Sequence, residues 1–235
     1  MSLKNWDNKT WLSSSSYIKS FNNFLLKQVK LNKNSQILDI GCGRGKILGS
    51  LSSKLGLKRK SIGIDIENHK DRDKRIIFKK IDALKFLKKN KKKFDLILVK
   101  QTIHLFKIKD IKTILKSSKT LLNPNGKIII FTLEPINNEI PTFSIMKKKL
   151  KKALIRDKKI IKSISYSFKG KLVRGFSYKV KISKKKYMEM VNSKYISVLL
   201  GMSHKLISSG LNEIKKKYKK QISFQDKLIC LVLNR

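Results

Sequence analysis

An apolar segment that runs directly into three closely spaced glycines is the feature that most restricts the fold of this chain. Residues 37–45 read Ile-Leu-Asp-Ile-Gly-Cys-Gly-Arg-Gly and precede a helix-like stretch at 46–55. A buried strand, a glycine-rich turn and a helix let the backbone approach a ligand and direct helix N-terminal N–H groups at it. The dinucleotide-binding fingerprint needs its third glycine at position 46, which is Lys46 here. The glycines instead form a G-x-G-x-G turn.

Strand-like segments follow this turn and alternate with helix-like ones. The strands are expected at 61–65, 76–82, 94–99 and 127–133, the last of them after a turn at 121–126. Such alternation requires a parallel sheet with right-handed crossovers and helices on both faces. In sheets of this kind, ligands bind in the crevice at the carboxyl ends of the strands.

Acidic side chains end two of these strands. Asp65 ends the segment 61–65, where an acid can accept hydrogen bonds from both hydroxyls of a ribose. Asp82, followed by Ala83, ends the segment 76–82. Each feature alone has a plain structural explanation, such as a tight turn or a helix cap. It is their occurrence together, in this order, that favours a cofactor site.

These segments together resemble the class I S-adenosylmethionine-dependent methyltransferases, closely over residues 35–135 and in outline elsewhere. The resemblance implies that S-adenosylmethionine is the cofactor, with its methionine half in the glycine turn and its ribose on Asp65. It also implies that Asp82 accepts the adenine amine and that the Ala83 N–H reaches a ring nitrogen. The cofactor-binding residues expected on this basis are Asp39, Gly41, Cys42, Gly43, Gly45, Asp65, Ile66, Asp82, Ala83, Lys100 and Gln101.

The expected fold is α/β, a Rossmann-like methyltransferase fold with a doubly wound, seven-stranded, mostly parallel sheet and a lid insertion. Segments 220–226 and 227–233 are strand-like with almost nothing between them, and only an antiparallel hairpin joins strands so directly. This matches the antiparallel seventh strand of the methyltransferase sheet. The expected parts are an N-terminal lid and entry helix at 1–34, a cofactor-binding core at 35–136, a substrate-covering insertion at 137–200, and a final helix with the strand hairpin at 201–235.

The insertion and the N-terminal segment are the parts expected to cover the acceptor. The elements expected there and after it are a helix over 144–155, a strand over 176–182, a helix over 184–191 capped by Ser183, and a crossover helix over 204–218 capped by Ser203. In outline the insertion resembles the acceptor-covering region of small-molecule methyltransferases such as trans-aconitate methyltransferase. Trp6, Trp11 and Tyr17 are candidate lid residues, although core packing explains Tyr17 equally well.

Methyl transfer needs an aligned nucleophile, and it needs a base only when the acceptor carries a proton. His104 is the candidate catalytic base, because it follows the strand 94–99 at the cofactor edge and its ordinary pKa is near neutrality. The alternative is a packed histidine. Glu134, at the end of the fifth strand, is a weaker candidate. Since His69 and His204 lack ligand spacing with each other or with a cysteine, no metal site is expected.

The expected function is methyl transfer to oxygen or nitrogen of a small molecule. If the insertion folds inward, an anionic acceptor could be bound by Arg174, Lys179, Lys181, Lys194 and Tyr195. A ribosomal or transfer RNA methyltransferase is the alternative, and a cofactor-binding protein without catalysis is a third hypothesis. With two cysteines and no apolar stretch long enough for a signal core or a membrane span, a reduced, cytoplasmic protein is expected.

The net charge of +42 is the main argument for a nucleic-acid partner. However, only 7 of the 57 basic residues are arginine, whose planar fork usually reads phosphates and base edges. The lysine runs 88–93 and 215–220 both precede strands, so both are expected at the amino-terminal edge of the sheet, opposite the cofactor crevice. Nucleic acid is therefore a less favoured partner than a small molecule.

Overall fold

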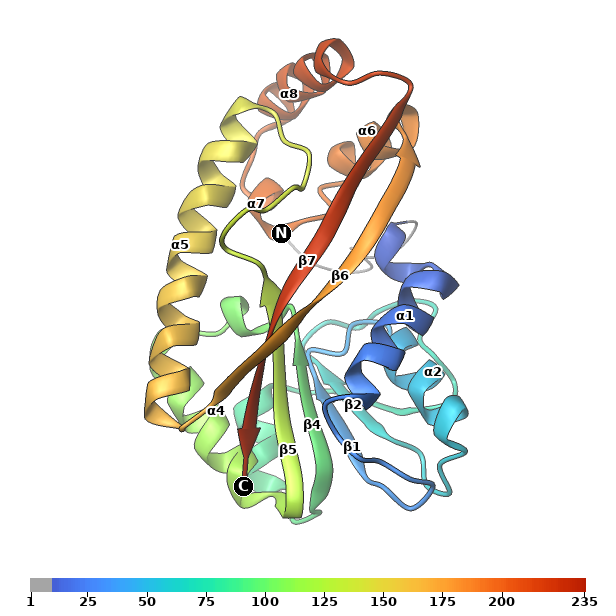
Figure 1. Cartoon of the computed structure of the whole chain (residues 1–235), viewed down its shortest axis with the longest axis vertical. Helices are drawn as coiled ribbons and strands as arrows, with labels where there is room; N and C mark the ends of the chain where they lie inside the picture. Colours follow the sequence, from blue (N-terminus) through green and yellow to red (C-terminus); the bar gives the residue numbers. More distant parts are fainter. Residues whose placement is uncertain (1–9) are drawn as a thin grey trace.

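A seven-stranded sheet runs through the part of the protein that the computed structural model describes, residues 10–235 (Figure 1). The strands lie in the order β3-β2-β1-β4-β5-β7-β6, and β7 is antiparallel to both of its neighbours while the other pairs are parallel. Their bounds are β1 Ile37–Ile40, β2 Ile62–Asp65, β3 Ile77–Lys80, β4 Phe94–Lys100, β5 Leu122–Leu133, β6 Lys171–Ser183 and β7 Gln221–Asn234. The predicted α/β fold with a mostly parallel sheet is confirmed.

Helices cover both faces of this sheet. Their bounds are α1 Ser15–Leu26, α2 Lys46–Leu55, α3 Ala83–Lys89, α4 Ile108–Thr120, α5 Ser144–Ser167, α6 Lys184–Asn192, α7 Ser197–Leu200 and α8 His204–Lys217, with short 3₁₀ turns η1 Trp11–Ser13 and η2 Ile103–Leu105. Helices α1 and α2 pack on one face, and α3, α4 and the end of α5 pack on the other. The predicted caps are confirmed, because the hydroxyls of Ser183 and Ser203 accept the N–H groups that begin α6 and α8.

The central strands are buried on both sides, which explains their nearly continuous apolar sequence. All four residues of β1 are buried, and so are the side chains of β4 from Leu96 to Val99. Alternate residues belong to different hydrophobic clusters: Leu96 and Leu98 face α1 and α2, whereas Ile97 and Val99 face α3 and α4. Each residue along β4 therefore contributes to one of two cores.

The end of the chain differs from the expected hairpin. Residues 221–234 form one continuous strand, whose second half pairs with β5 and which pairs with β6 over most of its length. The expected reversal between Asp226 and Lys227 does not occur, and both residues lie within the strand, where their side chains have partners. Asp226 is buried and accepts a hydrogen bond from Trp11, while Lys227 pairs with Glu139. The partner strand β6 comes from residues 171–183.

A second layer of structure lies beyond the carboxyl end of β5 (Figure 1). The first half of β7 and the second half of β6 extend into it as a two-stranded ribbon, together with α6, α7, α8 and the beginning of α5. Helix α5, expected over 144–155, continues for 24 residues and reaches back to the face of the sheet. Residues 137–200 thus supply both covering helices and the edge strand β6.

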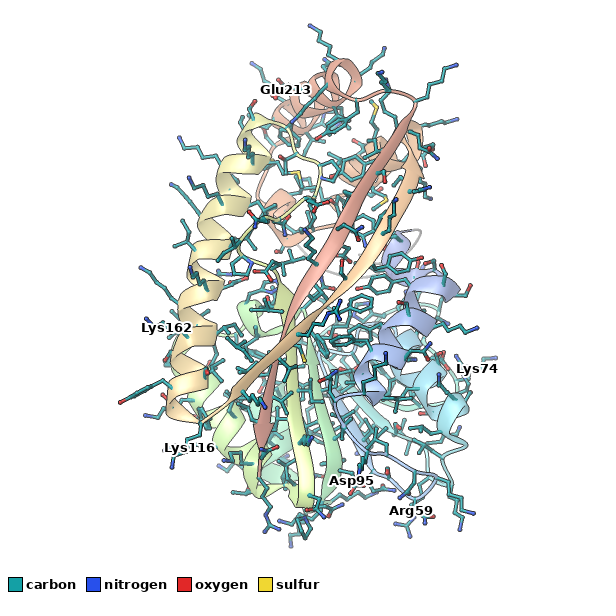
Figure 2. The ribbon with its side chains drawn as sticks, viewed as in Figure 1. Arg59, Lys74, Asp95, Lys116, Lys162 and Glu213 are labelled. Carbon is teal, nitrogen blue, oxygen red and sulfur yellow. The ribbon has the colours of Figure 1, made fainter. Side chains whose placement is uncertain are left out.

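One of the two lysine runs lies at a different edge of the sheet from the one expected, because β7 is antiparallel. Lysines 88–93 precede β4 and lie at the amino-terminal edge, as expected. The run 215–220 precedes β7, whose beginning lies beyond the carboxyl end of β5, so this run is at the same end of the sheet as the crevice. Basic side chains are widely spread: Lys74 projects from one side of the molecule, and Lys116 and Lys162 project from the other (Figure 2). Among the described helices, none has the length and apolar composition needed to cross a bilayer.

The two-sided burial of β4 gives a test of the fold. Leu98 is 0% exposed, so we expect Leu98→Ala to lower the free energy of unfolding by about 2–5 kcal/mol through lost burial and a residual cavity. Leu172 on β6 is 54% exposed, and Leu172→Ala is expected to change stability by about 0.5 kcal/mol or less. Urea unfolding of both variants measures the difference, and equal losses would contradict this assignment of the core.

Candidate active site

A cavity of about 420 Å³ lies at the carboxyl edge of the sheet. The ends of β1, β2, β4 and β5 form its floor, and η1, α5, the segment leading into α7, and β7 contribute its walls. The carboxyl ends of parallel strands are where an α/β sheet places ligands. Of the expected cofactor residues, those that line the cavity are Gly41, Asp65, Ile66, Asp82, Ala83 and Gln101.

The glycine turn between β1 and α2 is held in one shape. Gly41, Gly43 and Gly45 have φ angles of 75°, 55° and 71°, which favour glycine. The Gly41 N–H bonds the carbonyl of Ile64 at 2.8 Å, and a Cβ on Gly41 would lie 2.3 Å from the side chain of Thr102. A Cβ on Gly43 would meet nothing within 4 Å. The turn therefore packs tightly against the end of β4 at its beginning and leaves open space at its middle.

Asp65 is positioned at the end of β2 by three donors. Its carboxylate accepts the N–H groups of Gly43 and Glu67, each at 2.9 Å, and lies 3.5 Å from Nε2 of His69. Burial raises the pKa of Asp65, but these hydrogen bonds outweigh it and hold the pKa below its ordinary value. The side chain is therefore an ionised acceptor at neutral pH.

The beginning of α3 supplies the next part of the cavity. Asp82 is the N-cap of this helix and accepts the Lys85 N–H at 3.1 Å. Ala83 is the first residue of the helix, a position whose N–H has no partner within a helix. Ile66, 64% exposed, lies on the same cavity wall. Asp82 thus offers a ligand a hydrogen-bond acceptor, the Ala83 N–H offers it a donor, and Ile66 offers it an apolar contact.

The remaining expected cofactor residues lie around the cavity and do not line it. Asp39 is buried in β1, and burial raises its pKa to about 7 against the opposing effect of Lys100. One oxygen of Asp39, Oδ1, accepts no hydrogen bond from the described residues. The pKa of the Cys42 thiol is raised, first by burial and then by Asp39 and Asp65. Gly43 and Gly45 complete the turn.

Lys100 and Gln101 form the end of β4. The Lys100 ammonium donates to Oε1 of Gln101 at 2.8 Å and lies 5.3 Å from the ring centres of both Tyr17 and Phe21. Gln101 has a φ of 51°, a conformation that non-glycine residues rarely adopt. This bend turns the chain so that Gln101, Thr102 and His104 all line the cavity.

His104, the candidate base, lies in η2 and lines the same cavity. Its Nδ1 is shielded from solvent and has no hydrogen-bond partner among the described residues. Burial lowers the pKa of His104 below its ordinary value, Asp157 opposes this shift, and Arg156 adds to it. Arg156 and Asp157 belong to α5 and bond each other at 2.9 Å. The imidazole is thus predominantly neutral at neutral pH and can accept a proton.

Sequence reasoning missed Asp226, which also lines the cavity. This side chain is 0% exposed and accepts the Trp11 indole N–H at 2.9 Å through Oδ2, while Oδ1 accepts no hydrogen bond from the described residues. Burial raises its pKa, against the effects of Trp11, Lys100 and Tyr17. The only sequence signal was an acid inside an apolar strand, and it resembled a turn.

The other candidates are placed as follows. Trp11 lines the cavity, Tyr17 is fully buried in the aromatic core, and Trp6 lies outside the described residues. Glu134 does not line the cavity and accepts the N–H of Ile136. Of the basic and aromatic side chains proposed for an anionic acceptor, Arg174, Lys179 and Lys181 are exposed away from the cavity, Lys194 donates to the carbonyl of Met202, and Tyr195 alone lines it.

No group of three metal-ligating side chains occurs within the described residues 10–235. His69 lies against Asp65, whereas His204 is exposed at the beginning of α8.

Comparison with known proteins connects this geometry with a family. A family model described as "Methyltransferase domain" matches residues 31–195. A comparison with curated protein sequences finds no match. Among solved structures, a putative methyltransferase from an antibiotic biosynthesis pathway of Anabaena variabilis is similar with a TM-score of 0.62 and 14% identity, over 92% of this chain and 96% of that chain.

Two further structures share the fold. The plantazolicin methyltransferase BpumL, in complex with SAH and a monoazolic desmethylPZN analog, has a TM-score of 0.51 and 17% identity, over 98% of this chain and 88% of that chain. A putative methyltransferase from Bacillus halodurans has a TM-score of 0.52 and 13% identity, over 92% and 98%. Because the family model covers most of the chain and the sheet has the same architecture, this protein belongs to the methyltransferase-domain family and is a class I methyltransferase dependent on S-adenosylmethionine.

Proposed function

We propose that this enzyme methylates an oxygen or nitrogen of a small molecule that binds in the cavity at the carboxyl edge of the sheet. The observation that carries the proposal is one cavity lined both by six of the expected cofactor residues and by His104, whose Nδ1 is buried and unpaired. A cavity of about 420 Å³, partly walled by α5 and the segment before α7, suits small ligands. The resemblance of the covering region to trans-aconitate methyltransferase remains a prediction.

The residues around the glycine turn fit S-adenosylmethionine. The open space at Gly43 gives a ligand access to the backbone, and the ionised Asp65 offers two oxygens to a pair of hydroxyls. Asp82 and the N–H of Ala83 offer an acceptor and a donor to an adenine. When bound, S-adenosylmethionine supplies a methyl group on a positively charged sulfur, which a nucleophile displaces in line.

The chain contributes positioning and a place for the proton. His104 presents a neutral imidazole whose Nδ1 is buried and unpaired, so it can accept a proton from a hydroxyl or an amine of the acceptor. Asp157 then stabilises the imidazolium, since its charge favours the protonated form. Helix α5 and Trp11 form two of the walls beside which the acceptor would bind.

RNA is the second candidate acceptor. One observation favours it: the exposed lysine run 215–220 lies at the same end of the sheet as the cavity. Against it stands the wide distribution of basic side chains over the surface, which favours weak, salt-sensitive binding without sequence preference. A cofactor-binding protein without catalysis is disfavoured by the complete motif.

We also place the enzyme in the cytoplasm, a proposal supported by two unpaired cysteines.

A release assay separates these acceptors. Purified protein is incubated with S-adenosylmethionine and either pooled cell metabolites or total RNA, each with and without nuclease, and S-adenosylhomocysteine is measured. We expect release with the metabolite pool that nuclease treatment leaves unchanged. Release that requires intact RNA at physiological salt would replace the small-molecule proposal, and no release from any pool would favour the non-catalytic hypothesis.

The role of Asp65 is tested by calorimetry with S-adenosylhomocysteine. We expect Asp65→Asn to weaken binding by about 1.5–3 kcal/mol, the range for hydrogen bonds to a charged group, because the substitution removes the charge at nearly constant volume. Glu189→Gln makes the same charge change on the exposed face of α6 and should leave affinity within about twofold. An unchanged affinity for Asp65→Asn would place the ribose elsewhere.

His104 is tested with the acceptor pool identified above. We expect His104→Gln to reduce turnover by about 10²–10⁴-fold, the usual contribution of a general base, while S-adenosylhomocysteine affinity stays within about twofold. Since the pKa of His104 is lowered, wild-type turnover should decline only below about pH 6.5, where the imidazole becomes protonated. The variant should lack this acidic limb. Turnover near that of the wild type would make His104 a packing residue.

A further inference from the structure

Asp226 is a carboxylate with an unsatisfied oxygen in the wall of the cavity. It is 0% exposed, and its Oδ1 accepts no hydrogen bond from residues 10–235, although Oδ2 is bound by Trp11. The Tyr17 hydroxyl lies close enough to Asp226 to lower the pKa of its carboxyl, but it makes no well-formed hydrogen bond with either carboxylate oxygen. A buried carboxylate oxygen without a donor is costly, because it has lost its hydration without compensation. Oδ1 thus has capacity for a donor from a ligand.

The cavity is acidic although the protein as a whole is strongly basic. Six of the chain's 15 acidic residues line it, namely Asp65, Glu67, Asp82, Asp110, Asp157 and Asp226. Among residues 10–235, two lysines or arginines line it, Lys107 and Arg156. An anion entering this space would meet repulsion from most of the charged groups, whereas a cation would be attracted.

Aromatic side chains accompany the unsatisfied carboxylate. Trp11 donates to Asp226 and also packs edge-on against Tyr195, with ring centres 5.4 Å apart and planes at 65°. Both rings line the cavity. A carboxylate with Trp and Tyr around it is the combination that binds ammonium groups, through a charge-assisted hydrogen bond and cation–π attraction.

Positive charges near Asp226 are already engaged by other groups. Arg156 bonds Asp157 on α5, which leaves Asp226 as the buried acid without such a partner. Lys100 lowers the pKa of Asp226, but it donates to Gln101 and does not line the cavity. Lys107 is exposed at the end of η2. None of these cations is placed by a hydrogen bond on Oδ1.

We propose that the methyl acceptor carries an ammonium group, which Asp226 binds through Oδ1 at a site lined by Trp11 and Tyr195. This inference rests on the proposed function and specifies its substrate class as a cationic amine in place of an anion. The ammonium is assigned as the group that holds the acceptor in the cavity.

The test is binding of three phenyl-bearing probes of similar size and different charge to the protein in complex with S-adenosylhomocysteine. Benzylammonium, benzyl alcohol and benzoate are titrated by calorimetry at neutral pH. We expect benzylammonium to bind at least about tenfold more tightly than benzyl alcohol, and benzoate to bind more weakly than both, since one charge-assisted hydrogen bond is worth about 1.5–3 kcal/mol. Equal affinity for the three probes, or preference for benzoate, would overturn the proposal.

Substitutions test whether the preference for an ammonium group comes from Asp226. Asp226→Asn keeps the shape of the side chain and an acceptor for the Trp11 indole, and we expect it to reduce benzylammonium affinity by about tenfold while benzyl alcohol is little affected. Glu189→Gln on α6 is the matched control for net charge and should retain wild-type selectivity. An ammonium preference that survives in a folded Asp226→Asn protein would refute the role of Asp226.

A second variant and the assay of the proposed function make two further outcomes interpretable. If Asp226→Asn does not fold, Trp11→Leu removes the aromatic face and should selectively weaken benzylammonium; an unchanged charge preference in that variant would overturn the assigned site. Failure of the proposed function is recognised separately in the release assay, because it would appear there as release that requires intact RNA or as no release from any pool. Tight S-adenosylhomocysteine binding without charge selectivity would refute the ammonium inference alone.

Discussion

The hydrogen bond between Trp11 and Asp226 joins the two ends of the described chain at the cavity. It holds η1, which leads into α1, against the middle of β7, the last strand, and so fixes two walls of the cavity relative to each other. Because both partners are buried, breaking the bond would leave a carboxylate with two unsatisfied oxygens. The shape of the acceptor side of the cavity, and the ribbon above the sheet, depend on this contact.

The gathering of the expected cofactor residues at one cavity could be predicted from the sequence because its determinants are local. The turn after the buried strand needs positive φ angles, which glycine favours. The two acids follow parallel strands, whose carboxyl ends meet at the same edge of the sheet. Thus Gly41, Asp65 and Ala83 line the cavity as expected. Lys100 and Asp39 lie beside the cavity without lining it. For Lys100 this placement goes with its packing over the rings of Tyr17 and Phe21, which no local sequence pattern reports.

The acceptor half could not be predicted in the same way, because its residues come from segments far apart in the chain. Asp226 was hidden within a strand whose polar middle resembles a turn, and its burial is intelligible only once Trp11 is beside it. The position of lysines 215–220 was wrong for a related reason: the direction of β7 reverses the edge at which its first residues lie. Asp157 and Arg156 lie on the part of α5 that the sequence pattern did not extend to. These features are decided by contacts between segments far apart in the chain, and not by local secondary-structure propensity.

The position of β7 between β5 and β6 affects the order in which the protein can be completed during synthesis. Strand β6 is made before β7, yet β7 is its hydrogen-bonding partner, so β6 remains an unpaired edge until residues 221–234 emerge. Strands β1 to β5 can pair earlier, since each has a partner already made. A nascent chain can therefore form the cofactor-binding half while the acceptor half still lacks its central strand. Residues 221–234 complete the sheet, and a chain without them would lose the buried acid and one wall of the cavity together.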